Sequence, residues 1–260
     1  MGAGAGMETR RLILERLIKP IRPRVVRSFA PPPAPIARDI WSLERRLLMP
    51  GGLGLPTRTT VIRLRSQGLL VVSPPPVEAG GMEHLDSLGQ VAEALLPNSF
   101  HYLNAREFLA RHPRALLRIA PELRLRAPEL PSAEELTDEA PESWRGSLEH
   151  LILGPVHGLS EIALFHHPSA TLILTDLAFH MIRFERRLDR LAWRLAGVPA
   201  GFGPSRTSRR LLLCDRRVAA AFLERVLAWP FERVLVAHGE PLELNAGRVF
   251  RRAFAAYVSA

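Results

Sequence analysis

The sequence has few of the features that identify a disulfide-rich, membrane or nucleic-acid-binding protein. Cys214 is the only cysteine among 260 residues, which excludes an intramolecular disulfide and any zinc site built from several cysteines. It follows three leucines in residues 211–215, so we expect an inert thiol buried in the core. A chain without disulfides suits a reducing compartment, and the cytoplasm is the expected location.

Long apolar runs are also missing. No stretch approaches the roughly 18 uninterrupted apolar residues of a membrane-spanning helix, so no transmembrane segment is predicted. Glu15 and Lys19 interrupt the N-terminal apolar residues, which argues against a secretory signal peptide.

Lysine is nearly absent, although the formal net charge is +9. Lys19 is the only lysine, and no basic run is interleaved with the aromatic side chains on which bases would stack. Net charge alone does not specify a nucleic-acid partner. We therefore expect a small-molecule substrate rather than nucleic acid. The sequence identifies neither that substrate nor an oligomeric state.

Proline divides the chain into two parts. Residues 7–18 have helical apolar spacing and are followed by Pro20, and residues 30–35 are rich in proline. We interpret residues 1–36 as a basic helix with a proline-rich linker, and residues 37–260 as one domain. A short helix is predicted over 39–48.

The remainder alternates strand and helix patterns. Strands are expected at 59–64, 69–73, 91–96, 115–120, 147–153, 161–165, 171–175 and 233–237, and helices at 82–88, 105–111, 183–195, 217–227 and 246–257. The first two strands form a predicted hairpin, and Asn104 is the expected N-cap of the helix over 105–111. This order indicates mixed sheets covered by helices.

Four metal-ligand residue types follow predicted strands. They are His101, His157, Asp176 and His238, each in a loop after a strand, where functional sites tend to form. A single histidine at such a position is usually structural, and Asp176 could instead satisfy main-chain donors. The shared placement makes the set more informative than any one member.

The order of these residues resembles that of metallo-β-lactamase-fold proteins. Residues 155–165 can be laid over the Pro-Gly-His-Thr-Pro-Gly-Ser pattern of that family, residues 171–176 look like its strand ending in a metal-bridging Asp, and residues 237–239 look like its terminal Gly-His-Gly. The resemblance covers about residues 40–258 and is closer to an uncharacterised bacterial and plant branch. It implies an α/β fold, an αββα sandwich of two mixed β-sheets flanked by helices.

The first histidine loop departs from the family. Active members carry His-x-His-x-Asp-His there, whereas this chain offers only His101, with Asn98 as a weak oxygen ligand and Tyr102 where the closer branch has another His. The resemblance therefore implies at most the reduced set His101, His157, Asp176 and His238. Such a set suits one zinc or iron ion, and the alternative is that no metal is bound.

Two functions are compatible with this sequence. In the first, the chain is a metal-dependent hydrolase of an ester or thioester, with Asp176 in the reaction centre and Tyr102 donating a hydrogen bond to the developing oxyanion. In the second, the chain is a non-catalytic binding or scaffold protein that keeps the fold and has lost the site. The missing histidines favour the second, and the placement of Asp176 and His238 favours the first.

Overall fold

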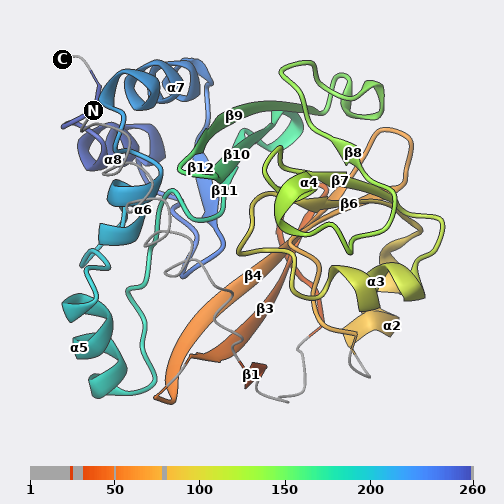
Figure 1. Ribbon diagram of the computed structural model, residues 1–260, viewed down its shortest axis with the longest axis horizontal. Helices are drawn as coiled ribbons and strands as arrows, with labels where there is room; N and C mark the ends of the chain where they lie inside the picture. Colours follow the sequence, from red (N-terminus) through yellow and green to blue (C-terminus); the bar gives the residue numbers. More distant parts are fainter. Residues whose placement is uncertain (1–23, 26–31, 50, 78–80, 259–260) are drawn as a thin grey trace, which may run out of the picture.

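The computed structural model describes residues 24–25, 32–49, 51–77 and 81–258. These residues form two β-sheets with helices outside them (Figure 1). The helix predicted over 7–18 lies outside the described residues. Among the described residues, no helix is both long and apolar enough to cross a membrane.

The larger sheet is mixed and has the order β1-β3-β4-β5-β6-β7-β8, with β2 also paired to β3. Its strands are β1 (Arg24–Val25), β2 (Ala34–Ala37), β3 (Ile40–Met49), β4 (Leu53–Arg63), β5 (Leu69–Val72), β6 (Val91–Leu96), β7 (Leu116–Ile119) and β8 (Glu134–Glu135). Pairing is antiparallel from β1 to β5 and parallel from β5 to β8. The predicted hairpin is confirmed, with Thr60 opposite Val72.

The smaller sheet is also mixed and has the order β12-β11-β10-β9. Its strands are β9 (Leu148–Val156), β10 (Leu159–His166), β11 (Thr171–Leu174) and β12 (Arg233–Val236). The first three run antiparallel in sequence, and β12 adds parallel to β11. The C-terminal ends of β11 and β12 therefore lie at the same edge.

Helices flank both sheets. They are α2 (Gly81–Leu88), α3 (Ala105–Arg111), α4 (Leu123–Arg126), α5 (Arg187–Leu195), α6 (Arg206–Leu211), α7 (Arg216–Ala228) and α8 (Ala246–Ala253), with 3₁₀ turns at Glu142–Trp144 and His167–Ser169. Helices α2 and α3 lie by the larger sheet, and α6, α7 and α8 lie on the opposite side of the molecule by the smaller one (Figure 1). The expected αββα sandwich is confirmed.

The alternation of side chains along β10 shows how the core is built. Ile162 and Leu164 pack into the cluster shared with the larger sheet, whereas Ala163 and Phe165 pack with the helices on the other face. All eight residues of this strand are buried, as expected when both faces of a sheet are covered.

Two sequence-based predictions of local structure were wrong, and one helix was missed. The segment expected as a helix over 39–48 is strand β3, because its ten-residue pairing with β4 outweighs a helical spacing of apolar residues. Cys214 is exposed, since the chain turns outward there before α7, while Leu212 and Leu213 stay buried. The helix α6 was not predicted.

Residues 1–36 were interpreted as a helix and a linker, with no strand among them. Instead, β1 pairs with β3, and β2, which spans the expected boundary at residue 36, also pairs with β3. Pro35 is tolerated in β2 because this strand lies outside the main strand order of the sheet, where a missing main-chain donor costs little.

Candidate metal centre

Three of the four expected ligands come together. One ligand atom each from His101, Asp176 and His238 lies within 4.8 Å of the others. His101 Nε2 is 3.1 Å from Asp176 Oδ2, and His238 Nε2 is 3.4 Å from Asp176 Oδ1. The side chains are 7%, 14% and 6% exposed, so the group is largely shielded from water.

Strand ends bring these side chains together. His101 is in the loop after β6, Asp176 directly follows the end of β11 at Thr175, and His238 follows Ala237 at the end of β12. The larger sheet thus supplies one imidazole, and the smaller sheet supplies the carboxylate and the other imidazole. Convergence of loops at one edge of a sheet is the usual setting for a site in an α/β fold.

The ring of His238 is oriented by the main chain. Its Nδ1 lies 2.9 Å from the carbonyl oxygen of Pro56, which can only accept, so Nδ1 carries a proton. In the neutral ring the lone pair of Nε2 then points to Asp176, and two acceptors face each other unless a proton or a cation lies between them. A carbonyl on the distal nitrogen is the usual partner of a metal-binding histidine. The ring also stacks on Phe179, with centroids 4.9 Å apart.

Asp176 is held from two further sides. Asn98, which is fully buried, donates through Nδ2 to Asp176 Oδ2 at 2.7 Å. Glu161, also fully buried, accepts from the amides of Thr175 and Asp176 at 2.5 and 2.9 Å and from the Thr175 hydroxyl at 2.7 Å. These contacts fix the turn that presents the carboxylate.

The two acidic groups respond to this environment in opposite directions. Burial disfavours ionised Asp176, but the adjacent His101 and His238 outweigh it and hold the pKa of that carboxyl well below its usual range. Burial and the nearby Asp176 carboxylate raise the pKa of Glu161 to about 8, against the hydrogen bonds from Thr175 and Asp176.

The remaining predicted site residues lie differently. His157 is exposed in the turn between β9 and β10, with φ of 49°, and does not belong to the three-residue group. The ring of Tyr102 is half-buried against the core of the larger sheet. Its hydroxyl makes no hydrogen bond within the described part of the chain.

Three features of the site were missed from the sequence. Glu161 was not among the predicted site residues, but it accepts from the main-chain amides of Thr175 and Asp176. Asn98 was considered as an oxygen ligand, yet its Oδ1 accepts from the amide of Phe100 and its amide nitrogen supports Asp176. The partner of His238 is the main-chain carbonyl of Pro56, which cannot be recognised from the residue type. The one sequence clue to these features was Glu161, a carboxylate within a largely apolar strand.

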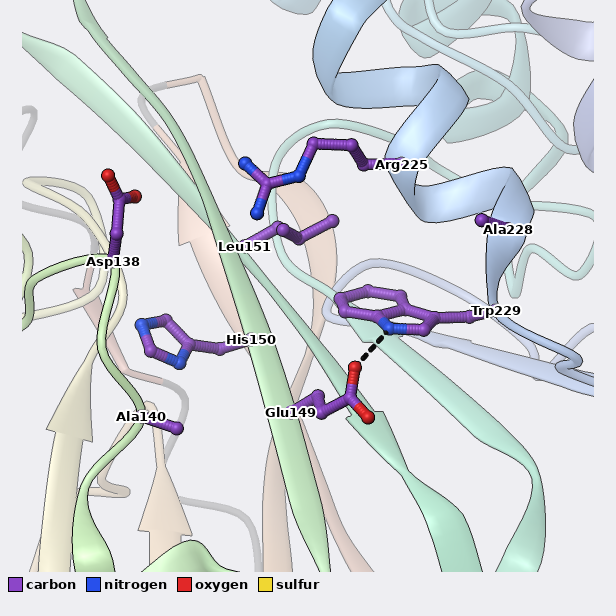
Figure 2. Close-up of a pocket in the computed structure, with 8 residues that line it drawn as sticks. All are labelled: Asp138, Ala140, Glu149, His150, Leu151, Arg225, Ala228 and Trp229. Carbon is purple, nitrogen blue, oxygen red and sulfur yellow. Dashed lines mark hydrogen bonds between the residues drawn. The ribbon is translucent and has the colours of Figure 1, made fainter.

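Two cavities formed by the described residues lie apart from this group. One, of about 460 Å³, lies between β9 and the end of α7. In Figure 2, Glu149 at its border accepts from the indole of Trp229, and the Arg225 side chain extends from its helix above Leu151. The other cavity, of about 650 Å³, is lined by residues such as Arg63 and His166. Neither is lined by His101, Asp176 or His238.

Comparison with solved structures identifies the fold. The flavodiiron core of Flv1 from Synechocystis sp. PCC6803, described as metal soaked, is similar with a TM-score of 0.59 at 14% identity; the match covers 86% of this chain and 60% of that one. A putative diflavin flavoprotein fragment from Nostoc sp. PCC 7120 has a TM-score of 0.63 at 13% identity, covering 92% and 97%. The metallo-β-lactamase FIM-1 from Pseudomonas aeruginosa, in its mono-zinc form, has a TM-score of 0.58 at 11% identity, covering 88% and 97%.

The chain spans only 60% of the Flv1 core, so that relative is the longer protein. No curated protein matches the sequence significantly. A family model described as "Domain of unknown function (DUF4336)" matches residues 37–187, more than half of the chain. The chain therefore belongs to the DUF4336 family and has a metallo-β-lactamase-like fold.

Proposed function

We propose that this protein binds one zinc or iron ion through His101, Asp176 and His238, and that it hydrolyses a carbonyl ester or thioester. The observation that carries the proposal is the convergence of two imidazoles and one carboxylate within 4.8 Å. Two histidines and a carboxylate are a donor set that both catalytic zinc and non-haem iron use. Two relatives in fold are described as metal soaked and mono-zinc, which agrees with this assignment.

The surrounding residues suit such an ion. Pro56 fixes the tautomer of His238 so that Nε2 is free to act as a ligand, and Asn98 and Glu161 keep the Asp176 turn in place. When bound, a divalent ion supplies Lewis-acid chemistry for hydrolysis at a carbonyl carbon. Three protein ligands leave the coordination sphere incomplete, as in catalytic rather than structural sites.

Tyr102 is the donor that we propose for the developing oxyanion. It directly follows His101, and its hydroxyl has no partner within the described residues, so its hydrogen bond is still available. His157 is left out of the proposed ligand set, because it is exposed in a turn and lies outside the group of three.

Hydrolysis assays with a matched pair of variants test the function. The substrates are p-nitrophenyl acetate and an acetyl thioester, and the protein is purified without chelators. Replacing a ligand should lower kcat/KM by about 100-fold or more, so we expect this loss in His101→Ala. His157→Ala makes the same chemical change at an exposed position and should keep the wild-type rate.

The second candidate, a non-catalytic binding or scaffold protein, is favoured by one observation. Neither of the two cavities reaches the three-residue group, so neither offers a substrate direct access to it. Equal rates in the wild type, His101→Ala and His157→Ala, at the level of buffer alone, would contradict the hydrolase and leave this second function.

A further inference from the structure

The larger cavity is rich in arginine and lies far from the candidate metal centre. Its volume is about 650 Å³, within the range of small-molecule sites. Pro56 of β4 contacts His238, whereas Arg63 at the other end of β4 lines the cavity. Six residues of extended chain lie between Pro56 and Arg63, so these two are roughly 20 Å apart. The cavity is therefore a separate feature.

Three guanidinium groups from different segments border it. Arg38 comes from the turn between β2 and β3, Arg63 from the end of β4, and Arg65 from the turn that follows. Asp39 is the one carboxylate among the lining residues, 3.5 Å from Arg38 and 3.9 Å from Arg63. Positive charge therefore exceeds negative charge in the cavity.

Of the three arginines, Arg65 is the one without a polar partner among the described residues. It is exposed and has no hydrogen bond or ion pair with the described part of the chain, whereas Arg63 donates to the carbonyl of Leu88. Its guanidinium lies against Gly146, where a Cβ atom would be 2.8 Å from Cζ. Glycine at this position, with φ of 72°, thus leaves room for the arginine head group beside the main chain.

A buried histidine adds a second, independent observation. His166 is fully buried and lines the cavity, and its Nδ1 lies 2.7 Å from the hydroxyl oxygen of Ser169. The Ser169 hydroxyl donates its one proton to the hydroxyl oxygen of Thr171, so it accepts a hydrogen bond from Nδ1 of His166. Nδ1 therefore carries the proton of the neutral ring, and Nε2 is an acceptor. Nε2 is buried and has no partner among the described residues. A buried polar atom of this kind points to a missing group, such as water or a ligand donor.

We propose that this cavity binds a small polyanion bearing phosphate or carboxylate groups, paired with Arg38, Arg63 and Arg65. Guanidinium groups bind both oxyanions through charge-assisted, often bidentate hydrogen bonds. This site is independent of the proposed hydrolase function.

Isothermal titration calorimetry with pyrophosphate and with citrate tests the site and distinguishes the two oxyanions. Arg65→Ala should weaken binding by about tenfold or more, because an unpaired guanidinium is lost. Arg251→Ala is the matched control: Arg251 is exposed on α8, has no partner among the described residues, and its loss changes the net charge equally. It should leave binding unchanged.

A variant with the opposite effect sharpens the test. Asp39 has φ of 61°, a conformation that asparagine tolerates well, so Asp39→Asn should fold and bind the anion more tightly. His238→Ala should bind both anions as the wild type does, which excludes capture by a metal ion. Absence of binding at millimolar anion, or equal weakening in Arg65→Ala and Arg251→Ala, would overturn the proposal.

Discussion

Asp176 is contacted by three side chains from separate parts of the chain. Asn98 and His101 approach one carboxylate oxygen from the loop after β6, and His238 approaches the other from the end of β12. Glu161 fixes its main-chain amide. A residue with this many partners adopts one orientation, which is what a metal ligand requires.

At the same scale, His166 gives a prediction about acid stability. Burial lowers its pKa from 6.5 to about 4, so between these values the unfolded chain binds a proton that the folded chain does not. Its stabilising contribution is complete above pH 6.5 and is lost as the pH falls through 4, on the order of 3 kcal/mol at most.

Urea unfolding at a series of pH values measures this effect. In His166→Gln, which cannot titrate, the free energy of unfolding should fall less steeply between pH 6.5 and 4 than in the wild type. Parallel curves for the two proteins would show that His166 does not contribute to the acid sensitivity.

Among the elements, the helix ends show what a sequence pattern predicts and what it leaves open. Asn104 is the N-cap residue of α3 as predicted, but its side chain makes no cap bond and donates instead to the carbonyl of Pro74. Asp215, which was not predicted as a cap, accepts from the amides of Arg217 and Val218 at the start of α7. A preferred residue type marks the position, but neighbouring main chain decides which hydrogen bond forms.

Asp215→Ala should therefore destabilise the protein by about 1 kcal/mol, because two amides at the start of α7 lose their acceptor. The loss matters because α7 covers the smaller sheet with Phe222, Leu223 and Val226. Asp215→Asn keeps an acceptor oxygen and should cost much less. Chemical denaturation of the three proteins gives the comparison, and a wild-type value for Asp215→Ala would refute the capping role.

Strand β3 shows a limit of local patterns. Ile40, Leu43 and Leu47 have helical spacing, yet the segment pairs along its whole length with β4 across a turn containing Gly51 and Gly52. The two glycines adopt positive φ values of 83° and 75°. Pairing between segments is not visible in the spacing of one of them, so the sequence predicted the wrong element here.

For the whole molecule, mixed sheets covered by helices and polar residues at the strand ends could be predicted because buried strands are apolar and their loops are not. The αββα arrangement was implied by the resemblance to metallo-β-lactamase-fold proteins. Which ligands meet could not be predicted, because that depends on how the two sheets pack. Arg58 is part of that packing: it reaches from β4 to the carbonyl of Val236 in β12 and to Ser42 Oγ at 2.9 Å. This contact lies beside the strand end that presents His238.

The position of His157, outside the three-residue group, also follows from how the strands are connected. Its sequence motif aligned with a metal-binding loop, but β9 and β10 are joined by a short turn that leaves the histidine exposed. Glu161, four residues later, instead contributes to the site through main-chain amides. The motif therefore lies next to a strand that supports the three-residue group through Glu161, while His157 itself lies outside that group.

Metal content, measured by elemental analysis on protein purified without chelators, tests the central claim most directly. The wild type and His157→Ala should each carry about one zinc or iron ion per chain, because three ligands can hold a single ion. His238→Ala should carry none, and only the first two proteins should lose thermal stability when a chelator is added. A wild type without metal, or a His238→Ala protein that keeps it, would contradict the assignment of His101, Asp176 and His238 as a metal centre.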